Sequence, residues 1–255
     1  MKIEQTEHPV FHAIECGDLS ETIRLLGDAQ CDTPRNAWNA TPLIMAAWHG
    51  HLGIAKTLLD RGADINAFYN AGNTPLIVAA WHGHVDVVKY LLSEGVDIAF
   101  KNRGGDDALA WAAEHGHLEI LESLLAAGAD SVDAALVFAC ENGHGKIAAL
   151  LLCKGASLEY QHGEYHLTPL AAAAYKGYLD LVQFLLDEGA NIHALDDAAL
   201  GWACGSQQLG TAEFLISHEA NVHGHGAEGL TFLQEAEKKG RTTVADFLRR
   251  HGARE

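Results

Sequence analysis

Two stretches of the sequence are nearly the same: NATPLIMAAWHGHLGIAKTLLDRGADIN at residues 39–66 and GNTPLIVAAWHGHVDVVKYLLSEGVDIA at residues 72–99, aligned at a shift of 33 residues. The leucine of Thr-Pro-Leu marks the same point in further copies, at Leu43, Leu76, Leu109, Leu136, Leu170, Leu200 and Leu233. Glycine stands seven and nineteen residues after each of these leucines, except that Gln207 and Glu219 follow Leu200. A fixed period of this length predicts stacked repeats that share one core.

The repeats extend to both ends of the chain. Counting backwards from Leu43, Val10 takes the place of the leucine and Gly17 follows it seven residues later. This gives eight repeats, of which the first and last are atypical caps. We predict one domain over residues 1–255, with repeats at about 8–33, 39–67, 72–100, 105–130, 131–160, 166–194, 197–224 and 229–253.

Each repeat is expected to form two short helices. Thr41 is a suitable N-cap, and Pro42 suits the first helical position because its missing N–H is harmless there. The glycine at the seventh position after the leucine is expected to end this helix in a left-handed cap. The second helix has apolar residues at helical spacing, for example Val85, Val88, Leu91 and Leu92, or Leu179, Val182, Leu185 and Leu186.

The pattern G-x-TPL-x-x-AA-x-x-GH-x-x-x-V-x-x-LL-x-x-GAD-x-N resembles the ankyrin repeat, over about residues 8–253. The resemblance implies an all-α solenoid with β-hairpin loops, called fingers, between the helix pairs. The interval from Leu109 to Leu136 is 27 residues and that from Leu170 to Leu200 is 30. We therefore expect the fingers before Leu136 and Leu200 to be stunted or absent, and the finger at 161–166 to be intact.

The resemblance also implies a concave groove lined by the two residues between Ala-Ala and Gly-His. Trp48 and Trp81 stand at the first of these positions, and aromatic anchors are typical of protein interfaces. The alternative is that these two indoles stack on each other and on side chains such as Trp38. Trp111 and Trp202, at the second position after the leucine, are expected to belong to the core. The predicted partner-binding residues are Trp38, Trp48, His49, Tyr69, Trp81, His82, Arg103, Glu114, His115, Glu141, Asn142, Tyr175 and Lys176.

Sixteen histidines invite a metal or catalytic interpretation, which their spacing does not favour. Four follow the first glycine of a repeat and are expected to hydrogen-bond loop backbone: His51, His84, His117 and His144. Histidines in the row of His49 would lie about 10 Å apart, too far to share a metal ion. Those at 162, 166, 223 and 225 are expected to be solvated, and Cys140 and Cys204 to be small buried residues.

Charge and composition limit the classes of partner. The 255 residues carry a net charge of −17, with 48% hydrophobic and 20% charged residues, as expected for a globular protein. This charge argues against general binding to nucleic acid or to an anionic membrane. Residues 104–237 hold 3 basic and 20 acidic residues, which indicates either a solvated acidic face or the attraction of a basic partner.

Localisation is inferred from the termini and the cysteines. The start, MKIEQTEHPVFHAIE, lacks the apolar segment of a signal peptide, and the longest Leu-rich run, residues 147–153, is too short to cross a bilayer. Five cysteines without clustered spacing suit reduced thiols. We expect a cytoplasmic monomer.

These observations predict a non-catalytic module that needs no cofactor or metal ion. It would bind a protein with a basic surface through its groove and finger tips. The alternative is a dedicated inhibitor, such as a bacterial immunity protein or antitoxin that blocks a toxin enzyme. A third class, an enzyme built from scattered loop residues, would require a deep pocket with convergent polar groups, because no catalytic motif occurs in the sequence.

Overall fold

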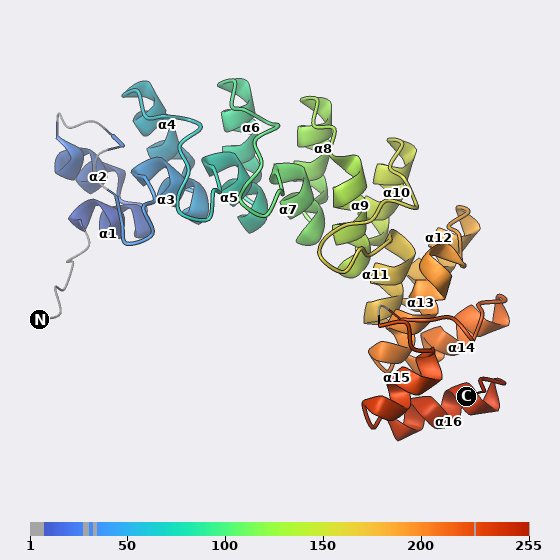
Figure 1. Ribbon diagram of the computed structural model, residues 1–255. Coiled ribbons are helices and arrows are strands. Elements are labelled where there is room, and N and C mark those ends of the chain that lie inside the picture. The colour runs from blue at the N-terminus through green and yellow to red at the C-terminus, as the bar shows by residue number, and fades with distance from the viewer. Residues whose placement is uncertain (1–7, 28–30, 33–34, 227, 255) are drawn as a thin grey trace, which may run out of the picture. The chain divides into compact units, whose positions relative to one another are not determined.

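The computed structural model describes residues 8–27, 31–32, 35–226 and 228–254, which contain sixteen helices (Figure 1). Contacts divide the chain into an N-terminal unit that ends at Ser131 and a C-terminal unit that begins at Val132. The helices of the N-terminal unit are α1 (Pro9–Glu15), α2 (Leu19–Leu26), α3 (Pro42–His49), α4 (Leu52–Asp60), α5 (Pro75–His82), α6 (Val85–Ser93), α7 (Ala108–Glu114) and α8 (Leu118–Ala126). Those of the C-terminal unit are α9 (Val132–Glu141), α10 (Gly145–Cys153), α11 (Pro169–Lys176), α12 (Leu179–Asp187), α13 (Ala194–Gly205), α14 (Leu209–Ser217), α15 (Phe232–Lys238) and α16 (Thr242–Arg250).

Within the N-terminal unit the first helices of adjacent repeats pack side by side. Helix α3 contacts α1 and α5, and α5 contacts α7, so these inner helices form one row (Figure 1). The outer helices α2, α4, α6 and α8 form a second row that follows the same order. The alanine pairs at 46–47, 79–80 and 112–113 are buried, and their small side chains let neighbouring backbones approach closely. The stacked helix pairs predicted from the repeats are confirmed.

The helix ends follow the sequence prediction. The hydroxyl groups of Thr41, Thr74 and Thr168 accept hydrogen bonds from the backbone N–H three residues on, at 3.2–3.4 Å. Asp107 takes the same place in the fourth repeat, where its carboxylate accepts from the N–H of Ala110 at 3.1 Å. Gly50 ends α3 with φ 74°, a left-handed conformation that only glycine adopts without strain.

Histidine side chains tie each repeat to the preceding one. The Nε2 atom of His84 donates to the carbonyl of Trp48 at 2.8 Å, and that of His117 donates to the carbonyl of Trp81 at 3.1 Å. His51 makes the same bond to the carbonyl of Glu15 at 3.4 Å. Carbonyls near the end of a helix lack partners within it, and these imidazoles satisfy them. The backbone-bonding role predicted for these three histidines is confirmed.

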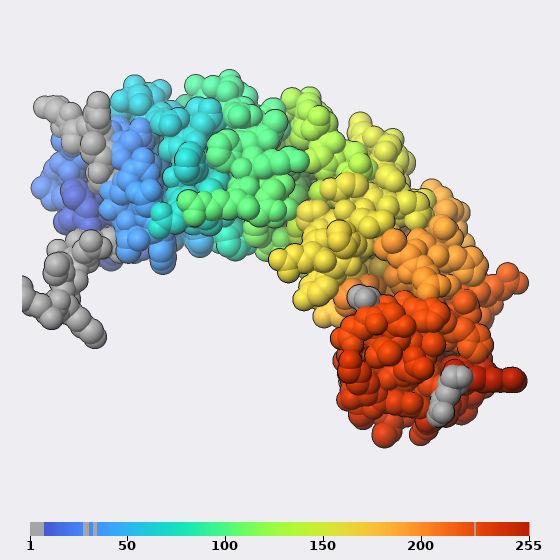
Figure 2. Space-filling model, in the orientation of Figure 1, coloured from blue at the N-terminus to red at the C-terminus, as the bar shows by residue number. Residues whose placement is uncertain are grey.

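The fingers are turns held by few backbone bonds. In the N-terminal unit the N–H of Asn70 donates to the carbonyl of Trp38, and that of Arg103 donates to the carbonyl of Ala71, both at 3.2 Å. The described residues contain no extended strand, only isolated antiparallel bridges at His162–Leu167 and His225–Thr231. The first bridge closes the finger at residues 161–166, which protrudes from the C-terminal unit and is coloured yellow in Figure 2. The intact finger predicted there is therefore present.

The two shortened intervals lack such fingers. Helix α9 begins at Val132, directly after the turn that ends the fourth repeat. Before Leu200, three consecutive residues of α13 (Leu195, Asp196 and Asp197) have φ of 52°, 57° and 61°, so the right-handed part of this helix begins after them. Left-handed conformations cost a non-glycine residue about 1–2 kcal/mol each.

Side-chain bonds hold this left-handed segment in place. The buried carboxylate of Asp197 accepts from the N–H of Asn221 at 2.8 Å and bonds Nδ1 of His193 at 3.0 Å. The carboxylate of Asp196 bonds both the backbone N–H and the Nδ1 of His225 at 2.9 Å. These bonds from His225 lower the pKa of Asp196. His225, expected to be solvated, is exposed but bonded to a carboxylate across the loops.

Some predictions concern residues outside the described ones. They are the start of the chain at residues 1–7, in which no signal peptide was expected, and residues 28–30 and 33 of the first repeat. Among the described residues, no helix combines the length and apolar character needed to span a bilayer.

Candidate functional site

Four tryptophans of the N-terminal unit line up across successive repeats. The ring centroids of Trp38 and Trp48 are 6.4 Å apart, those of Trp48 and Trp81 are 5.5 Å apart, and those of Trp81 and Trp111 are 4.7 Å apart. Trp48 lies near the end of α3, Trp81 near the end of α5 and Trp111 in the middle of α7, while Trp38 belongs to a finger. We call these four indoles the aromatic row.

Histidines fill the space between the indoles. The ring of His82 lies 4.5 Å from that of Trp48 and 5.1 Å from that of Trp81. Burial is the main cause that lowers the pKa of His82, and burial also lowers the pKa of His49. The Nε2 atoms of both histidines are buried and have no hydrogen-bond partner among the described residues. The neutral imidazole of His82 therefore acts as a packing group within the row.

Trp38 is the most accessible member of the row, with 58% of its surface exposed. The side chain of Asn36 fixes the turn that carries it, because its Oδ1 accepts from the N–H groups of Trp38 and Ala40 at 3.0 and 2.9 Å. On its other side Trp38 stacks on Trp48 with an angle of 22° between the rings. The Trp38 indole is thus held in place by its turn and by Trp48 while much of its surface stays open to solvent.

The structure shows the stacking that the packing alternative predicted, and it leaves the row partly exposed. Trp48 and Trp81 are half-buried, so both indoles remain at the surface. The prediction that Trp111 and Trp202 belong to the core is wrong, because both are also half-buried. At the position of Trp111 other repeats have buried Met45 and Val78, and the larger indole extends past the core to contact Trp81.

The other predicted residues of the N-terminal unit lie around this row. Tyr69 is half-buried, and its hydroxyl accepts from Nδ2 of Asn73 at 2.8 Å. Arg103 is exposed at a finger tip, where Gly72 must lack a side chain because a Cβ atom would lie 2.9 Å from the Arg103 nitrogen. His115 is exposed with its ring 5.8 Å from that of Trp111, and Glu114 beside it is half-buried.

The predicted residues of the C-terminal unit form a smaller polar group. Lys176 approaches Glu141 at 3.7 Å, and its ammonium lies 5.3 Å from the centre of the Tyr175 ring. The Nδ2 atom of Asn142 donates a hydrogen bond to the backbone carbonyl of Phe138 at 3.0 Å. Tyr175 also meets Trp202 edge to face at 5.6 Å. The prediction did not include this last aromatic contact.

Metal-ligating and thiol side chains were the other candidates for chemistry. The described residues contain no group of three or more His, Cys, Asp or Glu side chains arranged to hold a metal ion. The thiols of Cys140 and Cys204 are buried, which raises the pKa of Cys140 and raises that of Cys204 to about 12, so neither is a reactive thiolate at neutral pH.

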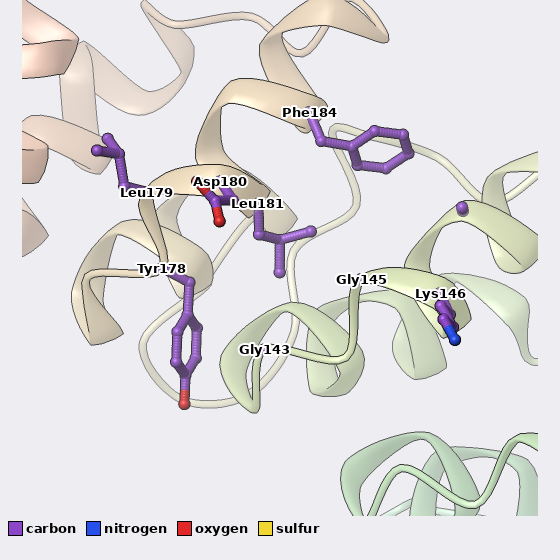
Figure 3. A pocket seen from close by; sticks show the side chains of 9 residues that line it. Gly143, Gly145, Lys146, Tyr178, Leu179, Asp180, Leu181 and Phe184 are labelled. Carbon is purple, nitrogen blue, oxygen red and sulfur yellow. The ribbon is translucent and has the colours of Figure 1, made fainter.

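A cleft of about 560 Å³ lies between the outer helices α10 and α12 of the C-terminal unit (Figure 3). It is open on one side and mainly apolar, unlike the deep pocket with convergent polar groups that an enzyme would require. Its lining residues are Gly143, Gly145, Lys146, Ala149, Tyr178, Leu179, Asp180, Leu181 and Phe184. The repeat pattern did not predict this cleft, although Gly145 stands where the other middle repeats have leucine or valine.

Comparisons with known proteins agree with this fold. A family model described as "Ankyrin repeats (3 copies)" matches residues 2–69, 67–134 and 109–196. The chain is also similar to the human ASB11 ankyrin repeat domain, with a TM-score of 0.72 and 26% sequence identity over 85% of this chain and 100% of that one. No curated protein matches the chain. With the family model covering most of its length, the chain belongs to the ankyrin-repeat family.

Proposed function

We propose that this chain binds another protein through the aromatic row of its N-terminal unit and the finger tips beside it. Ankyrin repeats are generally protein–protein interaction modules and are generally non-catalytic. The observation that carries the proposal for this chain is the stack of indoles that ends in the exposed Trp38. Large aromatic side chains of this kind are enriched among the residues that dominate binding energy.

The row is ordered before any partner arrives. Trp48 and Trp81 contact each other and the intervening His82, so their rings are restricted to the observed arrangement. A partner would therefore immobilise few side chains on this surface, which lowers the entropy cost of association. Stacked indoles also expose apolar area that water solvates poorly, and covering this area favours binding.

Charge supports a basic partner. Residues 104–237 hold 3 basic and 20 acidic residues, and this stretch includes Glu114 next to the row. An acidic surface accelerates the encounter with a basic one and orients the two proteins before contact. The expected consequence is an association rate that falls steeply as the salt concentration rises.

The test is the affinity for a partner isolated from the native source, measured by isothermal titration calorimetry. Trp38→Ala is the most informative change because the exposed side chain contributes little to the core. At an interface centre it should weaken binding by about thirtyfold, equivalent to about 2 kcal/mol. Trp202→Ala in the C-terminal unit is the matched control, and circular dichroism checks that both variants remain folded.

The outcomes separate the two kinds of binding protein predicted from the sequence. Loss of affinity in Trp38→Ala but not in Trp202→Ala supports the aromatic row as the interface. If Trp38→Ala and the wild-type protein bind the partner with equal affinity, the aromatic row is not the interface. One tight stoichiometric partner would indicate an inhibitor, and several weaker partners would indicate an adaptor. A flat salt dependence of the association rate would refute the proposed basic partner.

A further inference from the structure

The cleft between α10 and α12 lies where an alanine replaces the lysine of a bridging ion pair. In the N-terminal unit Lys89 of α6 reaches Glu119 of α8 at 2.6 Å, which connects two neighbouring outer helices. The corresponding residues in α10 and α12 are Ala149 and Asp180. Ala149 cannot reach across, so Asp180 lies on the edge of an open cleft instead of pairing with a lysine (Figure 3).

A second substitution opens the same space further. Gly145 is the first residue of α10, at the position where the other middle repeats have Leu52, Val85, Leu118, Leu179 and Leu209. Without a side chain there, the start of α12 lacks an apolar neighbour on this side. Leu179 is 41% exposed, although it was expected in the buried stripe of its helix.

The two sides of the cleft carry opposite charges. Lys146 on α10 and Asp180 on α12 are both exposed, and neither forms an ion pair with any residue in the described part of the chain. Between them lie Ala149, Leu181 and Phe184, which form an apolar floor. A surface ligand that fits this cleft needs an apolar stripe with a basic group on one side and an acidic group on the other.

We propose that this cleft binds an amphipathic helix of another protein. Its apolar stripe would cover Leu179 and Phe184, with Lys or Arg beside Asp180 and Asp or Glu beside Lys146. A helix suits the site because the cleft runs between two helices and is open along one side, so it covers only one face of its occupant. The surface lies in the C-terminal unit and is independent of the aromatic row.

The test begins with a display library of helical peptides of about 14 residues, selected on the full-length protein. The apolar positions follow the i, i+3, i+4, i+7 spacing of groove-binding helices, and the flanking positions are randomised. Selected peptides are then labelled and titrated by fluorescence anisotropy. The selection should enrich peptides with Lys or Arg on one side of the apolar stripe and Asp or Glu on the other.

The decisive variant fills the cleft: Gly145→Leu combined with Ala149→Lys. A Cβ atom on Gly145 would lie 4.0 Å from Cδ1 of Leu181, an ordinary contact, and the new lysine restores the arrangement of Lys89 and Glu119. This change should therefore leave the fold intact while it removes the site. Gly53→Leu is the matched control, since a Cβ atom at this position of α4 meets nothing within 4 Å.

We expect the filled variant to lose at least about tenfold in affinity for the selected peptides, or about 1.4 kcal/mol, while Gly53→Leu and Trp38→Ala bind normally. Failure to enrich binders, or peptides that bind the filled variant equally well, would overturn the proposal. Sedimentation equilibrium gives an independent check. A dimer that becomes monomeric in the filled variant would show that a second copy occupies the cleft, which would also overturn it.

Discussion

Replacing Gly83 by alanine tests how tightly adjacent repeats are connected. Gly83 ends α5 with φ 79°, and a Cβ atom there would lie 2.6 Å from Cε1 of His117. The imidazole would have to move, and it would lose its hydrogen bond to the carbonyl of Trp81 at 3.1 Å. The change therefore strains the backbone and breaks a contact between two repeats.

The two effects can be separated by magnitude. A left-handed alanine destabilises the folded state by about 1–2 kcal/mol relative to glycine. Alanine also makes the unfolded chain less flexible, which stabilises the protein by about 0.4–1 kcal/mol. Gly62→Ala, at φ 84° with nothing within 4 Å of the new Cβ atom, should show this backbone cost alone, roughly 1 kcal/mol. Gly83→Ala additionally loses a hydrogen bond worth about 1 kcal/mol and displaces the ring. We expect a total of about 2–3 kcal/mol.

The assay is urea denaturation followed by far-ultraviolet circular dichroism, with the same change repeated in a His117→Ala background. Without the imidazole the new methyl group has no clash, so Gly83→Ala should cost only about as much as Gly62→Ala. The expected coupling between the two sites is about 1–2 kcal/mol. Equal costs of Gly83→Ala in both backgrounds would refute the reasoning that the histidine fills the space above the glycine.

Three further predictions concern titration, stability and thiol reactivity. Because burial lowers the pKa of His82 below its usual 6.5, the unfolded state takes up the proton first, so unfolding free energy should fall from pH 7 to pH 5, and less so in His82→Gln. Asp197→Ala should destabilise the C-terminal unit by about 1.5–3 kcal/mol in urea, because the N–H of Asn221 loses a charged acceptor; an unchanged midpoint would contradict this. Ellman's reagent should modify the exposed Cys16 and Cys153 quickly in the folded protein, and a double serine variant should lack this fast phase.

The repeat pattern predicted most of the fold because the responsible interactions are local. Thr41 and Pro42 begin α3 and Gly50 ends it, and these residues act within one turn of the helix they limit. The missing fingers also followed from chain length alone, since too few residues remain before Leu136 and Leu200 to form one. The left-handed segment that starts at Leu195 could not be predicted, because it depends on bonds to the following loop.

The candidate site was only partly predictable, because it depends on side-chain size relative to neighbours in other repeats. The positions of Trp48 and Trp81 indicated an exposed row, and their contact was one of the two stated alternatives. The exposure of Trp111 was missed because its position is buried in repeats with smaller residues. The cleft beside Leu179 depends on a missing side chain at Gly145, and periodicity within one helix does not reveal such a gap.

The bonds from His84 to Trp48 and from His117 to Trp81 each join residues 36 apart in the chain. Each of these hydrogen bonds joins a repeat only to the repeat directly before it. If the residues from Gly50 to His82 were excised, His117 would meet the carbonyl of Trp48 just as it now meets that of Trp81. The N-terminal unit can therefore be shortened or extended by one whole repeat through deletion or duplication of its coding segment. Each new contact between repeats then contains the same histidine–carbonyl hydrogen bond.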